Sequence, residues 1–170
     1  MVDAIVYTSK CGHTYAYAKA LSEELNIPFY TLKEAKKKLP KGTSIIYMSW
    51  VKENKIVKYG SALKYHIDCV CAVGILPATE ERLGVVRDSN QLYAKLFYLP
   101  GGIRKKRLNL FQRITLKSIE SNLSFKLLDS GLKKEEALAL DAILHNLNYT
   151  DLNALSSILN LYKKKDDYIS

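Results

Sequence analysis

The chain alternates short runs of apolar residues with longer segments in which apolar residues recur every three or four positions. Short apolar runs are typical of strands buried on both faces of a parallel sheet, and the periodic segments are typical of amphipathic helices. The pattern predicts five strands, over residues 4–7, 28–32, 44–48, 70–73 and 94–99. It predicts intervening helices from just after Gly12 to about Asn26, then over 33–39, 57–65 and 79–90.

This alternation predicts an α/β fold with a five-stranded parallel sheet and helices on both of its faces. Ligands of such sheets bind beyond the carboxyl ends of the strands, at the point where the strand order reverses. Three loops follow strands at that edge, over residues 8–14, 49–55 and 74–78. These loops are the candidate ligand-binding segments.

After the fifth strand the pattern is helical only, over residues 108–122, 133–146 and 151–162. We therefore divide the chain into a sheet domain over 1–123 and a C-terminal helical extension over 124–170. The extension carries two amphipathic faces. We expect them to pack on the sheet domain or on a second copy of the chain, as a homodimer.

Composition narrows the class of protein. Of the 170 residues 48% are apolar and 25% are charged, as in a folded globular protein. No apolar run approaches the roughly 18 residues of a membrane span. The N-terminal residues do not resemble a signal peptide, and the three cysteines lack metal-binding spacing. These features predict a cytoplasmic protein rather than a disulfide scaffold or a zinc finger.

Charge adds a first indication of partners. The chain has 26 Lys and Arg against 17 Asp and Glu, a net charge of +9. Such a charge favours acidic partners or an anionic membrane surface, although solubility alone also accounts for it. The aromatic residues form no nucleic-acid-binding motif, so we expect no nucleic acid among the partners.

The first candidate loop joins a buried strand to the N-terminus of a helix. Backbone N–H groups and the helix dipole make such a junction an anion site. Ser9 and Thr14 add hydroxyl donors, and Gly12 lets the backbone approach a bound group closely. The loop chemistry therefore predicts a phosphate-binding site.

The wider stretch Ile5-Val6-Tyr7-x-Ser9-x-x-Gly12-x-Thr14-x-x-x-Ala18-x-x-Leu21 resembles the flavodoxin signature. The resemblance implies a three-layer sandwich with strand order 2-1-3-4-5 and non-covalently bound FMN. It also implies that the FMN phosphate is bound by Ser9, Lys10, Cys11, Gly12, His13 and Thr14. The alternative is a flavodoxin-like fold that has lost its cofactor and acts as a non-enzymatic interaction module.

The other two loops extend the resemblance. Ser49 and Trp50 end the third strand, where flavodoxins place an aromatic ring against the isoalloxazine, and Trp50 is the only tryptophan. Val51 replaces a glycine whose peptide flips in many flavodoxins, which disfavours a one-electron shuttle. We expect an FMN-dependent oxidoreductase or electron-transfer protein. The resemblance implies that the pyrimidine edge contacts the backbone of Gly74, Ile75, Leu76 and Pro77.

A second resemblance lies at the end of the sheet. The stretch Phe97-Tyr98-Leu99-Pro100-Gly101-Gly102-Ile103 and the basic residues after it resemble the flavodoxin-type protoporphyrinogen oxidases. The basic residues would lie near the flavin. They are either a solvated helix start or a docking surface for a redox partner protein, or for an anionic membrane that holds a quinone. In the last case the protein is peripheral to the inner membrane face. The residues are Arg104, Lys105, Lys106 and Arg107.

Two other functions found on similar topologies are excluded. The low-molecular-weight tyrosine phosphatases need Cys-x5-Arg, and the residue six positions after Cys11 is Tyr17. A phosphoacceptor receiver domain needs acidic residues at the first and third strand ends, where Tyr7 and Ser49 stand. We assign no catalytic side chain, because a flavin would itself carry the redox chemistry.

Overall fold

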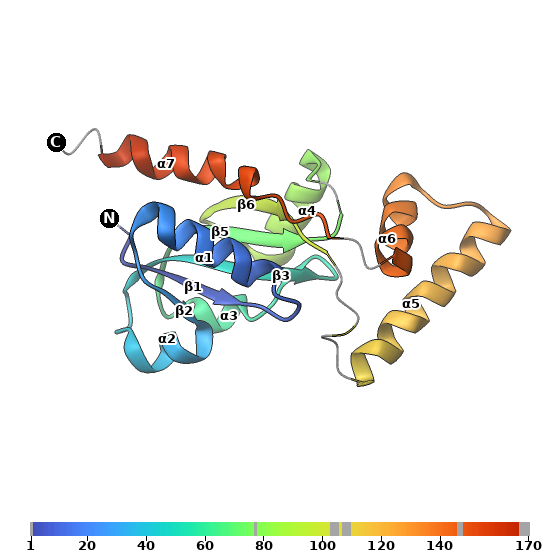
Figure 1. Ribbon diagram of the computed structural model, residues 1–170, viewed down its shortest axis with the longest axis horizontal. Helices are drawn as coiled ribbons and strands as arrows, with labels where there is room; N and C mark the ends of the chain where they lie inside the picture. The colour runs from blue at the N-terminus through green and yellow to red at the C-terminus, as the bar shows by residue number, and fades with distance from the viewer. Residues whose placement is uncertain (1, 77, 103–105, 107–109, 146–147, 167–170) are drawn as a thin grey trace.

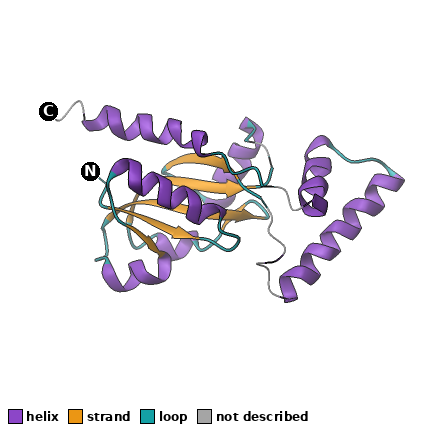
Figure 2. Cartoon of the chain, viewed as in Figure 1, coloured by secondary structure: helices purple, strands orange, loops and turns teal. Residues whose placement is uncertain are grey.

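A computed structural model of the chain describes residues 2–76, 78–102, 106, 110–145 and 148–166. It has the three-layer α/β architecture that the sequence predicts, with a central parallel sheet between two layers of helices (Figures 1 and 2). Five parallel strands follow the order β2-β1-β3-β5-β6. They are β1 (Ala4–Thr8), β2 (Phe29–Thr31), β3 (Ser44–Lys52), β5 (His66–Gly74) and β6 (Lys95–Pro100).

One strand was not predicted from the sequence. The carboxyl end of β3 turns back at Glu53 and Asn54, both at positive φ (49° and 62°), and pairs antiparallel with β4 (Lys55–Ile56). Residues predicted as a helix over 57–65 form only the short α3 (Tyr59–Ala62). The left-handed backbone of Lys58 (φ 59°) separates the hairpin from the helix, so α3 begins only at Tyr59.

Helices cover both faces of the sheet. On one face α1 (His13–Leu25) packs over the central strands, with Tyr17, Ala18 and Leu21 in the core. On the other face lie α2 (Leu32–Lys38), α3 and α4 (Glu80–Asn90). Thr31 and Thr79 cap α2 and α4, each accepting a backbone N–H of the first turn with its hydroxyl.

The helices after β6 separate into two groups. α5 (Leu110–Asp129) and α6 (Lys134–His145) form a helical hairpin, and the predicted boundary at residue 123 falls inside α5. The 3-10 helix η2 (Leu152–Leu155) and α7 (Ser156–Asp166) return to the sheet beside α1.

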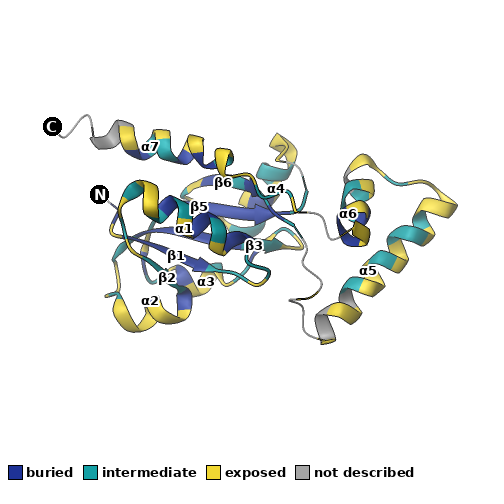
Figure 3. Cartoon of the chain, viewed as in Figure 1, coloured by how far each residue is buried: buried dark blue, intermediate teal, exposed yellow. Residues whose placement is uncertain are grey.

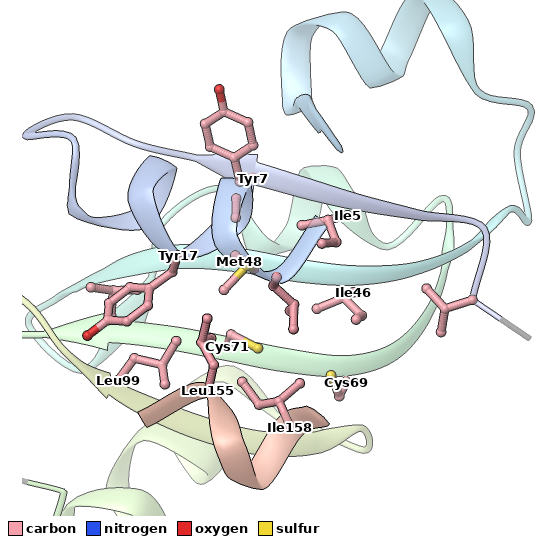
Figure 4. Close-up of a cluster of buried hydrophobic side chains, with 14 of the residues drawn as sticks. Ile5, Tyr7, Tyr17, Ile46, Met48, Cys69, Cys71, Leu99, Leu155 and Ile158 are labelled. Carbon is pink, nitrogen blue, oxygen red and sulfur yellow. The ribbon is translucent and has the colours of Figure 1, made fainter. Parts of the chain in front are cut away.

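The return of α7 completes the core. Leu155 and Ile158 pack with Cys69, Cys71 and other residues of the first face, as Figure 4 shows. The last helix is therefore part of the sheet domain, and the α5–α6 hairpin is inserted before it. Figure 1 shows this hairpin on the side of the sheet toward which the parallel strands point. None of the described helices is long and apolar enough to cross a membrane.

Candidate functional site

The candidate site begins where β1 ends. Gly12 stands at the N-cap of α1 with a positive φ of 94°, which favours glycine over any residue with a side chain. Its N–H donates to Ser9 Oγ at 3.2 Å, so the loop closes on itself. The first turn of a helix presents N–H groups that have no acceptor inside the helix, and the first turn of α1 carries no acidic side chain. This end of α1 is therefore electropositive.

A cavity of about 320 Å³ opens beside this loop. It extends from the end of β1, across the loop, to the junction of β2 with α2. The described residues that line it include three lysines and no acidic residue, which favours an anionic ligand. They are Tyr7, Thr8, Ser9, Lys10, Gly12, Tyr15, Thr31, Leu32, Lys33 and Lys58.

Aromatic rings support the β2 side of the cavity. The centroids of Tyr7 and Phe29 are 5.9 Å apart, and Tyr15 lies 5.9 Å from Tyr7 and 6.0 Å from Phe29. Burial, with a smaller effect of the Glu34 carboxylate, raises the pKa of Tyr7. The Tyr7 hydroxyl therefore stays protonated at neutral pH and adds no negative charge to the cavity.

The nearby Glu34 carboxylate has a structural role at the start of α2. Its carboxylate accepts the Thr31 hydroxyl at 2.7 Å and the Thr31 N–H at 2.9 Å, forming a capping box at α2. The hydrogen bond from the Thr31 side chain lowers the pKa of Glu34, with the backbone bond second. The Glu34 carboxylate is therefore hydrogen-bonded to Thr31. It is not among the described residues that line the cavity, whose charged side chains are Lys10, Lys33 and Lys58.

The structure distributes the predicted phosphate-loop residues over two environments. Ser9, Lys10 and Gly12 line the cavity, and Cys11 is half-buried between them. The side chains of His13 and Thr14 are buried at the start of α1. Any contact of the last two with a ligand would therefore come from their backbone N–H groups.

The His13 side chain connects the loop to the C-terminal part of the chain. Its Nδ1 lies 2.7 Å from Thr150 Oγ1. One turn later, the Tyr17 hydroxyl donates to the Pro100 carbonyl at 2.7 Å and accepts the Asp151 N–H at 2.9 Å. The segment before η2 is thus fixed to both α1 and the end of β6, next to the site.

At the second loop, Lys10 connects the cavity to Trp50. The Lys10 Nζ lies 5.3 Å from the centroid of the Trp50 ring, a cation–π contact, and Trp50 is half-buried. Ser49 is buried, and its hydroxyl donates to the Val57 carbonyl at 2.8 Å. Val51 pairs with Ile56 in the β3–β4 hairpin. Ser49 and Val51 therefore hold the hairpin, and the half-buried Trp50 ring lies near the end of β3 in contact with Lys10.

The third loop lies apart from the cavity. Gly74 ends β5 beside β6, and its carbonyl accepts the Gly101 N–H at 2.7 Å. Ile75 and Leu76 are half-buried, and Pro77 lies outside the described residues. None of the described residues of this loop lines the cavity.

Sequence reasoning missed part of the cavity wall. Lys33 follows the carboxyl end of β2, so the rule that ligands bind beyond strand ends was enough to include it. Lys58 had no such signal, because it reaches the cavity only through the β3–β4 hairpin. In the basic stretch, Lys106 is exposed, whereas Arg104, Lys105 and Arg107 lie outside the described residues.

The site partly fits the FMN that the flavodoxin resemblance implies. The cavity offers hydroxyls, a helix N-terminus and lysines for a phosphate, and Trp50 offers a ring for an isoalloxazine. Lys10 both lines the cavity and contacts the Trp50 ring. Comparison with known proteins adds no assignment: no protein-family model matches the chain, and no curated protein matches it.

Proposed function

We propose that this chain binds FMN and works as a flavodoxin-like oxidoreductase or electron-transfer protein. The observation that carries the proposal is the cavity at the end of β1, beside the N-terminus of α1: the described residues that line it include three lysines and no acidic residue. FMN would supply the redox chemistry, and the protein would supply binding, orientation and electrostatics.

The residues of the cavity suit the phosphate. Ser9 would donate a hydroxyl hydrogen bond, and the glycine conformation of Gly12 lets the backbone approach. Lys10, Lys33 and Lys58 would neutralise the phosphate charge through charge-assisted hydrogen bonds. Trp50 would stack on the ring system once Lys10 turns from the indole toward the phosphate.

Val51 bears on the kind of electron transfer. Its backbone belongs to the antiparallel pairing of β3 with β4, so a peptide flip at this position would break the hairpin. This supports transfer of two electrons together, to an acceptor such as a quinone or a redox partner protein. We propose that the protein is cytoplasmic. If it associates with an anionic membrane, the basic stretch around Lys106 would make the contact.

The second candidate function is a cofactor-free interaction module. Two observations favour it: Lys10 already covers Trp50, and the Ser49 hydroxyl is already used within the hairpin. An isolated protein without flavin absorbance, and without binding on FMN addition, would select this candidate.

The deciding experiment is an FMN titration of the wild type and of Gly12→Asp. The aspartate places a negative charge in the anion site, so we expect FMN affinity to fall by about 100-fold or more. Gly42→Asp is the matched control, because Gly42 also has a positive φ (83°) and lies on an exposed turn with open space around it. Equal FMN affinity in folded Gly12→Asp and Gly42→Asp would contradict the assignment.

A further inference from the structure

Lys10 lies between the two halves of the candidate site. It lines the cavity at the end of β1, and its Nζ lies 5.3 Å from the centroid of the Trp50 ring. Figure 3 shows the central strands of the sheet buried, whereas the loop that carries Lys10 and the end of β3 are partly exposed. The flexible four-carbon stem of an exposed lysine can therefore turn toward either half.

Two interactions favour Lys10 over the indole when no anion is bound in the cavity. The ammonium group is attracted to the electron-rich face of the Trp50 ring. Lys33 and Lys58 line the same cavity, and the described lining residues include no acid, so a third ammonium group in the cavity would be repelled. The contact with Trp50 therefore also separates like charges.

A phosphate in the cavity would reverse this preference. It would offset the repulsion among the three ammonium groups and accept a charge-assisted hydrogen bond from Lys10, which is stronger than the contact with the ring. A ligand shifts an equilibrium between two arrangements only if it binds one of them better than the other. The charge of the phosphate supplies that difference, because it favours the arrangement with Lys10 in the cavity.

We propose that Lys10 couples the two halves of the site, so that a phosphate in the cavity uncovers Trp50 for a flat aromatic group. The identity of that group as the flavin ring rests on the proposed function. Lys10 then determines specificity, because it favours a flavin that carries a phosphate over riboflavin, which has none. Since coupling between two binding sites is reciprocal, a ring on Trp50 would also strengthen phosphate binding.

Trp50 can report its own uncovering, because it is the only tryptophan in the chain. In the protein without flavin, we expect inorganic phosphate to increase the quenching of Trp50 fluorescence by acrylamide. Sodium chloride at equal ionic strength is the reference, since salt alone screens exposed charges. Lys10→Ala should show no phosphate-dependent change, because its indole is uncovered throughout. Lys10→Arg should keep the change, since arginine retains both the charge and the attraction to the ring.

Riboflavin tests the specificity. Loss of a cation–π contact at a partly exposed site changes an equilibrium constant by about two- to fivefold. We therefore expect Lys10→Ala to bind riboflavin more tightly than the wild type by that factor in phosphate-free buffer. Added phosphate should raise riboflavin affinity in the wild type but not in Lys10→Ala. Lys36→Ala is the matched control and should behave like the wild type, because Lys36 is exposed on α2 and is not among the described residues that line the cavity.

The fate of this coupling is separable from that of FMN binding. Unchanged Trp50 quenching on addition of phosphate to the wild type, or an equal phosphate effect in folded Lys10→Ala, would overturn the proposal even if FMN binds. If phosphate uncovers Trp50 through Lys10 but neither FMN nor riboflavin binds, the coupling is supported and the proposed function is contradicted. Circular dichroism checks that each variant folds.

Discussion

Gly74 lies where β5 and β6 end together, and Tyr98 crosses directly over it. A Cβ atom at position 74 would lie 1.8 Å from the Tyr98 Oη and 2.4 Å from its Cζ. The sequence resemblance assigned this glycine to a cofactor edge. The structure adds a steric reason that could not be predicted locally, because Tyr98 belongs to the next strand.

We expect Gly74→Ala to destabilise the protein by about 1–3 kcal/mol through overpacking. Urea unfolding at neutral pH measures the change. The same substitution in a Tyr98→Leu background should cost clearly less, because the ring that meets the new methyl group is gone. An equal cost in both backgrounds would show that the Gly74–Tyr98 contact is not the cause.

At the scale of elements, the β3–β4 hairpin determines where Trp50 and Lys58 lie, and α4 holds the hairpin. The Asn90 side chain accepts the Ile56 N–H at 2.8 Å and donates to the Asn54 carbonyl at 2.8 Å. It also donates to the Val86 carbonyl of its own helix at 2.7 Å. One side chain at the end of α4 therefore joins the hairpin to the sheet domain.

Asn90→Ala should detach the hairpin, because it leaves the Ile56 N–H and the Asn54 carbonyl without their partner. We expect a loss of about 1–3 kcal/mol in the free energy of unfolding. Hydrogen exchange at the Ile56 amide should become faster than at the β5 amides. Ser89→Ala is the control, since Ser89 accepts from Lys55 through its backbone carbonyl, which the substitution keeps. Unchanged exchange at Ile56 would count against this role of Asn90.

At the scale of the whole molecule, the layers of the fold were easier to predict than the position of each later element. The short apolar runs correctly predicted the five parallel strands and the helices α1, α2 and α4, because burial on both faces leaves a strong local pattern. β4 was not predicted, since a two-residue strand has no periodicity. The sequence left open whether the C-terminal helices pack on the sheet domain or on a second copy, and the structure has α7 on the sheet beside α1. No local pattern indicates which of the three amphipathic helices fits there.

The candidate site divides in the same way. The glycine, hydroxyl and lysine of the first loop were predicted from the chemistry of a strand–helix junction, and Ser9, Lys10 and Gly12 line the cavity. The His13–Thr150 contact joins residues 137 positions apart, so no local pattern indicated it. Lys33 could have been included by the strand-end rule, because it follows β2, whereas Lys58 reaches the cavity only through the β3–β4 hairpin and had no such signal.

Tyr162 fixes α7 to the sheet, and we expect this contribution to stability to depend on pH. Its hydroxyl donates to Asp68 Oδ2 at 2.5 Å and lies 3.3 Å from Cys69 Sγ. Burial is the largest cause, with the nearby Cys69 second, of a Tyr162 pKa raised far above the usual value of about 10. A tyrosine that is kept neutral in the folded state stabilises it fully below pH 10, and this contribution is lost as the pH rises further.

We therefore expect Tyr162→Phe to be less stable than the wild type by about 1–3 kcal/mol at neutral pH, because Asp68 loses its buried donor. This difference should narrow as the pH rises above 10, since the unfolded wild type then ionises Tyr162 and the folded form does not. Chemical unfolding at a series of pH values measures it. Tyr93→Phe is the control, because the Tyr93 side chain is fully exposed and its substitution should leave the free energy of unfolding nearly unchanged. A Tyr162→Phe difference that stays constant from neutral pH to above pH 10 would mean that Tyr162 ionises equally in both states, contrary to its burial between α7 and β5.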